Sequence, residues 1–166
     1  MNAFVDVFGY IAADVISEYG DGYYYYGHPS EIVNTLSQKS QNDTLKFQKF
    51  PMIGLFQDFS ERYEDLVWTV ENCTVILAQQ TKPTYKASER YTNTFKAVLY
   101  PMYEQLITSM NNSKYIQWDK NHVKIDRVYW GKEGLYGNTG NIFNDYIDAI
   151  EIKFNEIQIN KFCNYG

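Results

Sequence analysis

The residues best able to do chemistry are the two histidines, and one of them has an acid nearby. Asp119 and His122 lie three positions apart, so a carboxylate could orient an imidazole for acid–base catalysis. The surrounding segment is polar, and a solvated loop explains the pair more simply than a catalytic site does. His28 directly precedes Pro29, where a helix is predicted to begin, which favours a capping or surface role for this imidazole.

The cysteines offer neither a metal site nor a nucleophile. Cys73 and Cys163 are far apart in the sequence, neither belongs to a CxxC pair, and neither has an activating neighbour. A disulfide between them is disfavoured in a cytosolic protein. No Gly-x-Ser-x-Gly elbow occurs either. We therefore predict that the chain is not an enzyme and has no catalytic residue, metal or cofactor.

A glycine-rich stretch, residues 131–144, is the most unusual local feature of the sequence. Glycine recurs there at every third position, but Lys132 is followed by Glu133 and not by Ser or Thr, which argues against a phosphate-binding loop. Long loops in compact domains usually serve a function. We expect this loop to contact a neighbouring subunit, with a solvated surface as the simpler alternative for Lys132 and Glu133.

The candidate subunit interface combines this loop with an acidic segment, residues 58–65, which we expect to be a turn or a long hairpin loop. The interface residues are Trp130, Lys132, Glu133, Tyr136 and Asn138 from the loop and its start, and Glu61 and Glu64 from the acidic segment. Weak cation binding by the acidic segment is disfavoured, since a plain solvated turn accounts for its charges.

Composition limits the classes of protein to consider. The chain has 166 residues, about one domain. No stretch approaches the roughly 18 consecutive apolar residues of a membrane span. The apolar stretch 4–16 contains Asp6 and Asp14 and follows no basic residue, so it does not match a secretory signal. These features predict a cytosolic product without a membrane partner.

The charge distribution disfavours tight binding of nucleic acid. The net charge is −5, and residues 1–38 carry five acidic residues and no Lys or Arg, so the remainder of the chain is balanced. No basic patch is present to contact phosphates, although such a surface would let DNA slide past without being held. The 16 tyrosines suit either protein interfaces or a tyrosine-rich core.

Hydrophobic periodicity predicts three helices and five extended segments. The helices are residues 2–18, a helix that begins at Pro29, and residues 89–110 after Ser88 as N-cap, with Pro101 expected to kink or break the last one. The extended segments are residues 23–26, 45–59, 66–80, 123–130 and 146–159. Alternation along 66–80 places Trp68 and Val75 on opposite faces.

This order of elements predicts an α+β fold. We expect a largely antiparallel or mixed sheet of about four to five strands flanked by helices. Residues 1–44 would form an N-terminal helical extension packed on a core of residues 45–166, in a single domain overall.

A succession of short segments between residues 45 and 160 carries a resemblance to a known group of proteins. The segments are Phe50-Pro51-Met52-Ile53-Gly54-Leu55-Phe56, Val75-Ile76-Leu77-Ala78, Glu89-Arg90-Tyr91, Phe95-Lys96, Leu99-Tyr100-Pro101-Met102-Tyr103, Tyr129-Trp130-Gly131 and Asn144-Asp145-Tyr146-Ile147-Asp148-Ala149. They resemble small structural proteins of tailed phages that infect gut Bacteroidales, including the crAss-like group. The order of elements also resembles siphophage tail-terminator and neck-ring subunits.

The resemblance implies a structural virion protein. It implies a homo-oligomeric ring of six or twelve subunits in the neck or tail, in contact with adjacent neck, tail and portal proteins. Viral DNA would pass transiently through the lumen without sequence-specific recognition. The protein would reside in the virion, and in the host cytoplasm during assembly. The alternative is a phage accessory or adaptor protein that binds partners outside the virion without catalysis.

Overall fold

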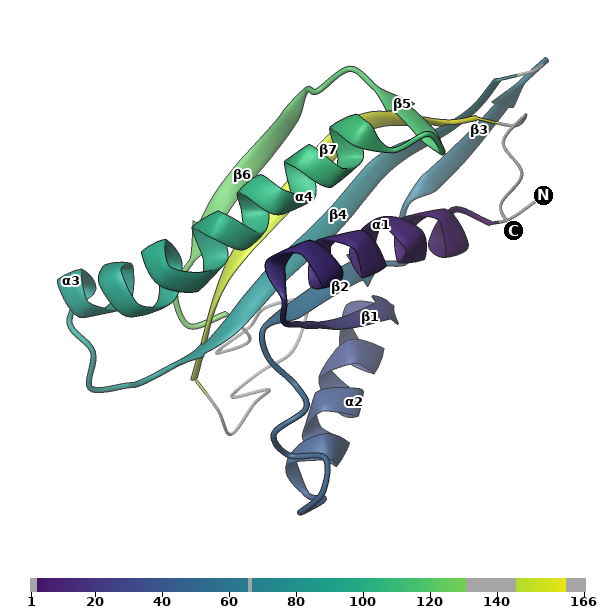
Figure 1. Ribbon diagram of the computed structural model, residues 1–166. Coiled ribbons are helices and arrows are strands. Elements are labelled where there is room, and N and C mark those ends of the chain that lie inside the picture. The colour runs from purple at the N-terminus through teal and green to yellow at the C-terminus, as the bar shows by residue number, and fades with distance from the viewer. Residues whose placement is uncertain (1–2, 66, 131–145, 161–166) are drawn as a thin grey trace.

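The computed structural model describes residues 3–65, 67–130 and 146–160, and Figure 1 shows their arrangement. The helices are α1 (Phe4–Tyr19), α2 (Pro29–Ser40), α3 (Ala87–Arg90), the π-helix η1 (Tyr91–Leu99) and α4 (Tyr100–Asn112). The strands are β1 (Tyr23–Gly27), β2 (Met52–Phe56), β3 (Ser60–Glu64), β4 (Val67–Thr81), β5 (Ile116–Trp118), β6 (His122–Arg127) and β7 (Tyr146–Ile159). The predicted α+β class is confirmed.

The strands form one mixed sheet built on the long strands β4 and β7. These two are antiparallel partners over nearly their whole lengths. β2 and β3 follow each other along the outer side of β4, while β5 and β6 follow each other along the outer side of β7. β1 adds to β2 as a parallel strand. All other pairs among the described strands are antiparallel.

The predicted number of strands is wrong, because the described sheet has seven. Residues 58–65, expected to be a turn or loop, contain β3, whose five side chains are all exposed. A strand without a buried face has no alternation that the sequence could reveal. β5 is short and lies in the polar segment after α4. Residues 45–49, expected to be extended, form turns and bends.

One face of the sheet, here called the helix face, is covered by α1 and by the long helix formed by α3, η1 and α4 (Figure 1). The apolar positions that the periodicity selected in both helices pack there against the strands. The buried helical residues are Phe4, Val7, Phe8, Ile11, Ala12, Val15, Phe95, Leu99, Met102, Leu106 and Met110. This packing confirms the predicted helical faces, because an apolar stripe must be buried against another element.

The opposite face, here called the far face, carries α2 and a second apolar cluster. Ile32 and Leu36 of α2 pack there on strand residues that include Met52 and Phe56. Trp130, which we expected at a subunit interface, belongs to this cluster. It is 1% exposed, and its ring stacks on Phe56 with centroids 6.4 Å apart. Its large apolar surface is thus satisfied within the chain, and we assign Trp130 to the core.

A crease crosses the sheet and shifts which residues face the helices. In β4 the helix face takes Trp68 and Val70, then Cys73 and Val75, so one residue is skipped at Asn72. Asn72 has a φ of 59°, a left-handed conformation that Asn tolerates better than most residues.

β7 skips one residue at Asn155 in the same way, since Phe154 and Ile157 both belong to the helix-face cluster. The register of the two strands is preserved because both skip together. The prediction that Trp68 and Val75 lie on opposite faces is therefore wrong.

Pro101 does not break the long helix. The backbone N–H of Tyr100 donates to the carbonyl of Phe95, five residues earlier, at the end of η1. In an α-helix the proline ring would clash with the carbonyl four residues before it. The wider π-helical turns directly before Pro101 remove that conflict, so the helix continues as α4 to Asn112.

The N-terminal third takes part in the same sheet through β1. His28 caps α2, because its Nδ1 accepts a hydrogen bond from the Ser30 N–H at 3.2 Å. This confirms the capping role predicted for His28. The division into residues 1–44 and 45–166 stays a prediction, and the pairing of β1 with β2 runs across it.

Candidate subunit-contact site

Asp119, one half of the potential acid–base pair, is held by amide groups. Its Oδ1 accepts from the Asn121 N–H at 2.9 Å, and its Oδ2 accepts from the Asn155 Nδ2 at 3.1 Å. These hydrogen bonds, that of Asn121 first, lower the pKa of the Asp119 carboxyl below its usual value. The carboxylate therefore joins the turn between β5 and β6 to the crease of β7.

His122, the other half of the pair, bonds elsewhere. Its Nδ1 donates to the Lys120 carbonyl at 2.9 Å, which leaves Nε2 to accept from the Tyr103 hydroxyl at 2.6 Å. No hydrogen bond joins the His122 imidazole to the Asp119 carboxylate. The two side chains are thus engaged in separate structural contacts that fix β5 and β6, and they do not form the acid–base arrangement.

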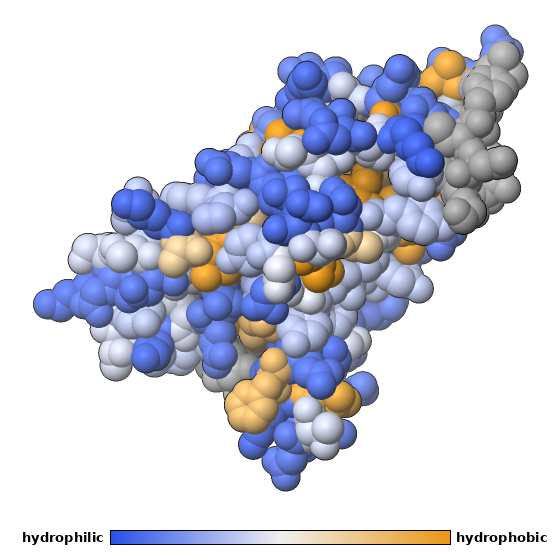
Figure 2. Space-filling view, viewed as in Figure 1, coloured by the Kyte–Doolittle hydropathy of each residue, from blue (hydrophilic) through white to orange (hydrophobic). Residues whose placement is uncertain are grey.

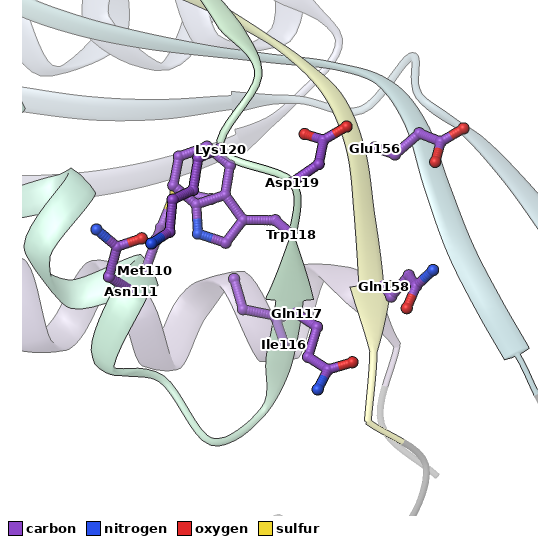
Figure 3. A pocket seen from close by; sticks show the side chains of 9 residues that line it. All are labelled: Met110, Asn111, Ile116, Gln117, Trp118, Asp119, Lys120, Glu156 and Gln158. Atoms are coloured by element: carbon purple, nitrogen blue, oxygen red, sulfur yellow. The ribbon is translucent and has the colours of Figure 1, made fainter.

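A pocket of about 460 Å³ lies beside β5 (Figure 3). In Figure 3, Trp118 and Lys120 point to one side of β5, Asp119 points toward β7, and Glu156 and Gln158 extend from β7 itself. These polar groups do not converge on a common point. The pocket therefore has no set of side chains arranged to act together on one bound atom, which catalysis would require.

Apart from Trp130, which is buried on the far face, the described residues of the predicted interface lie on β3. Glu61 and Glu64 are both exposed, and β3 pairs only with β4 among the described strands. The ring of Tyr63 stacks on Trp68 at 5.5 Å and its hydroxyl donates to Glu61 at 2.8 Å. The predicted interface residues Lys132, Glu133, Tyr136 and Asn138 lie outside the described residues.

Arg62 gathers carboxylates from three strands on the far face. It lies 3.3 Å from Glu64, 2.9 Å from Glu71 and 3.8 Å from Glu156. Three carboxylates around one guanidinium give this part of the far face a local charge of −2. The four side chains are between 29% and 67% exposed, so the network contributes little to stability. Its main effect is a negative surface next to β3.

β6 lies on the side of the sheet opposite to β3. Contacts between its polar side chains and Tyr100 attach it to α4. The Tyr100 hydroxyl donates to Asp126 at 2.6 Å, and the Lys124 Nζ donates to the same carboxylate at 2.7 Å. Burial, together with the hydrogen bond to Asp126, raises the pKa of Tyr100 to about 12. The Lys124 ammonium also lies 4.5 Å from the centre of the Tyr100 ring. These contacts hold β6 against α4, and no described strand pairs with its outer side.

Both flanks of the described sheet therefore end in strands that have a partner on one side only: β1 and β3 on the β4 side, and β5 and β6 on the β7 side. β3 pairs with β4 and β6 pairs with β7, and no other described strand joins either of them. Figure 1 shows them on opposite sides of the sheet. We call their outer sides the β3 edge and the β6 edge. The backbone N–H and C=O groups of such edges can pair with another chain.

A buried charged cluster that the sequence analysis missed lies where β4, β7 and the long helix meet. Asp148 is fully buried, and its Oδ1 accepts from the Tyr129 N–H at 3.2 Å. Arg90 lies 3.8 Å from its Oδ2 and donates to the Tyr129 hydroxyl at 3.3 Å. Burial raises the pKa of Asp148, opposed by the hydrogen bond from Tyr129 and by Arg90.

This cluster joins the two segments that flank residues 131–145. The sequence did contain an indication that Asp148 is buried, because this residue shares one face of the predicted strand with Ile150, Ile152 and Phe154. An acid at such a position needs a partner, and Arg90 supplies it from the long helix. The cluster is structural, since it fixes Tyr129 relative to β7.

The surface over α1 and α4 does not offer a large apolar patch. Figure 2 shows this side as mostly hydrophilic, with hydrophobic side chains in small separate groups. No helix in the described part of the chain is long and apolar enough to cross a membrane. Within residues 3–65, 67–130 and 146–160, no three His, Cys, Asp or Glu side chains gather as a metal site. Cys73 is a free, buried thiol whose pKa is raised by burial.

Comparison with known proteins gives no relative. No protein family, no curated protein and no solved structure matches the chain.

Proposed function

We propose that this chain is a structural subunit of a homo-oligomeric ring in the neck or tail of a tailed phage. It acts through contacts between copies and with neighbouring virion proteins, and not through catalysis. The resemblance of residues 45–160 to phage neck and tail subunits supports this proposal from the sequence. The structure adds the arrangement of the sheet.

The single observation that carries the proposal is the pair of edges at opposite sides of one sheet. A ring requires two different surfaces on each subunit that meet head to tail around a closed axis. The β3 edge and the β6 edge are two such surfaces, held at a fixed separation by the long pairing of β4 with β7. A subunit of this shape can contact one neighbour on each side.

The charge of the far face supports a role beside a DNA channel. Arg62 and its three carboxylates give a negative surface on the far face beside the crease. DNA phosphates are repelled by such a surface, so DNA would pass without being held. We therefore place the far face toward the lumen of the proposed ring.

The proposal is tested by the mass of the purified protein and by its location. Native mass spectrometry and sedimentation velocity over a range of concentrations should give a closed oligomer of defined size. Mass spectrometry of purified phage particles should detect the chain in several copies per particle. A chain that stays monomeric and is missing from particles would contradict the ring and favour the adaptor function instead.

A further inference from the structure

We propose that β3 of one copy pairs, antiparallel, with β6 of a second copy, so that the sheet continues from subunit to subunit. This inference rests on the proposed ring function and names its contact. It requires that four properties of the two edges agree: strand direction, the backbone groups that point outward, the face on which side chains lie, and charge.

The strand directions agree. β3 is antiparallel to β4, β4 is antiparallel to β7, and β7 is antiparallel to β6. β3 and β6 of one copy therefore run in opposite directions. When a second copy stands beside the first in the same orientation, its β6 lies antiparallel to the first copy's β3. Antiparallel pairs are slightly more stable per residue than parallel ones.

The turn between β3 and β4 determines which backbone groups of β3 point away from β4. Glu64 pairs with Val67, so only two residues separate the two strands, and Asp65 has a φ of 47°. Across a two-residue hairpin turn, the flanking residues exchange hydrogen bonds. Alternate residues do the same, so Glu64, Arg62 and Ser60 bond to β4. The N–H and C=O groups of Glu61 and Tyr63 therefore point outward.

A hydrogen bond next to β6 determines, in the same way, which backbone groups of β6 point away from β7. The Asn155 N–H donates to the Asn121 carbonyl at 3.2 Å, which places the backbone groups of Asn121 toward β7. By alternation along an antiparallel ladder, the N–H and C=O groups of Lys124 and Asp126 point outward. Each edge thus presents outward groups on at least two alternate residues.

The faces agree as well, which is a separate condition. Residues that pair across two strands place their side chains on the same face of the sheet. Tyr63 stacks on Trp68, and Lys124 and Asp126 contact Tyr100 of α4, so the outward-bonding residues of both edges carry their side chains on the helix face. A continuous sheet would then keep the helices of neighbouring copies on one side.

Charge selects this pairing over pairing of like edges. Counted over its own residues, β3 carries Glu61 and Glu64 against Arg62, a net charge of −1. β6 carries Lys124 and Arg127 against Asp126, a net charge of +1, and Arg127 also pairs with Glu151 of β7 at 2.9 Å. Two β3 edges, or two β6 edges, would bring like charges together. Glu61 can lie opposite Lys124 within the hydrogen-bonded register derived above.

Two proline variants test the contact. Tyr63→Pro and Lys124→Pro each remove an outward N–H while leaving the ladder bonds within the subunit, the position at which an edge strand tolerates proline. Tyr63→Ala and Lys124→Ala are the matched controls, since they lose the same side chain and keep the N–H. Circular dichroism and thermal melting check that all four variants fold like the parent.

Assembly is then followed by native mass spectrometry and sedimentation velocity. Each proline variant alone should be monomeric, both alanine variants should still assemble, and an equimolar mixture of the proline variants should give one-to-one heterodimers. The heterodimer forms because the Lys124→Pro chain keeps an intact β3 edge and the Tyr63→Pro chain keeps an intact β6 edge.

The other outcomes are distinct. Homodimers of Lys124→Pro alone would mean that two β3 edges pair, and would overturn the proposal. Ring-sized oligomers that persist in both proline variants would overturn this contact and leave the ring function standing. A parent protein that is monomeric at every concentration would overturn the ring function and the contact together.

A charge-reversed variant keeps the proposal testable if a proline variant unfolds. Glu61→Lys with Glu64→Lys changes only exposed side chains of β3 and makes the two edges alike in sign. The midpoint of assembly should shift to higher protein concentration at low salt, and added salt should reduce the shift. A midpoint equal to that of the parent would contradict the β3–β6 contact.

Discussion

The carboxyl group of Asp148 lies fully buried beside Arg90, at the junction of two strands and the long helix. Folding raises its pKa, so the folded state holds this proton more tightly than the unfolded chain does. The group therefore stabilises the fold fully below its unfolded pKa, near 3.8, and loses that contribution as the pH rises through the folded pKa.

Asp148→Asn removes this titration while keeping a side-chain oxygen that can accept from the Tyr129 N–H. The free energy of unfolding of the parent, minus that of the variant, should fall as the pH rises above the unfolded pKa of 3.8. Urea denaturation of both proteins at several pH values gives this difference. A difference that is independent of pH would show that Asp148 titrates alike in the folded and unfolded chain.

Two core residues test the helix face directly. Leu99 is fully buried and Trp68 is 2% exposed, so Leu99→Ala should cost about 2–5 kcal/mol of unfolding free energy and Trp68→Ala about 3–5 kcal/mol. Phe47→Ala is the control, since Phe47 is 80% exposed and its loss should change stability little. Urea unfolding curves for Leu99→Ala and Trp68→Ala that coincide with the parent's would contradict the placement of these residues.

At the scale of elements, the crease decides how the sheet fits the helices. Asn72 adopts a left-handed conformation in the middle of β4, where β-branched residues are strained. Asn72→Val should destabilise the protein by about 1–2 kcal/mol, whereas Asn72→Gly should be nearly neutral. Chemical denaturation measures both. If the two variants are equally stable, the crease does not depend on the backbone conformation of residue 72.

At the scale of the whole molecule, the predicted role of the glycine-rich loop stays open to test. Residues 133–141 lie outside the described residues, but the segments around them are joined, because the Trp130 N–H donates to the Ile147 carbonyl at 2.7 Å. Deleting residues 133–141 should leave the monomer folded, since a short connection can span joined ends.

The same deletion should impair assembly, if the loop contacts a neighbouring subunit. Thermal melting of the variant reports the fold, and sedimentation velocity reports the oligomer. A variant that melts like the parent and still forms complete oligomers would remove the loop from the interface. The β3–β6 contact would be unaffected by that result, because it involves other residues.

The sequence by itself determined the elements that bury an apolar face. The apolar stripes of α1 and the long helix reflect burial against the sheet, and the apolar runs of β4 and β7 reflect burial on both faces of the sheet. Burial of apolar area produces a pattern along the chain that the sequence shows. His28 as a cap was likewise readable, because capping is local.

Only the tertiary structure decided the features that depend on distant partners. β3 has no apolar face and forms a strand because β4 lies beside it. The sequence of residues 60–64 therefore could not predict this strand. The crease at Asn72 is matched by Asn155, and the burial of Asp148 is answered by Arg90, far away in the chain. Hydrogen bonds and ion pairs between distant segments leave no period in the sequence. The β3 and β6 edges likewise depend on which described strands lie beside each other in space.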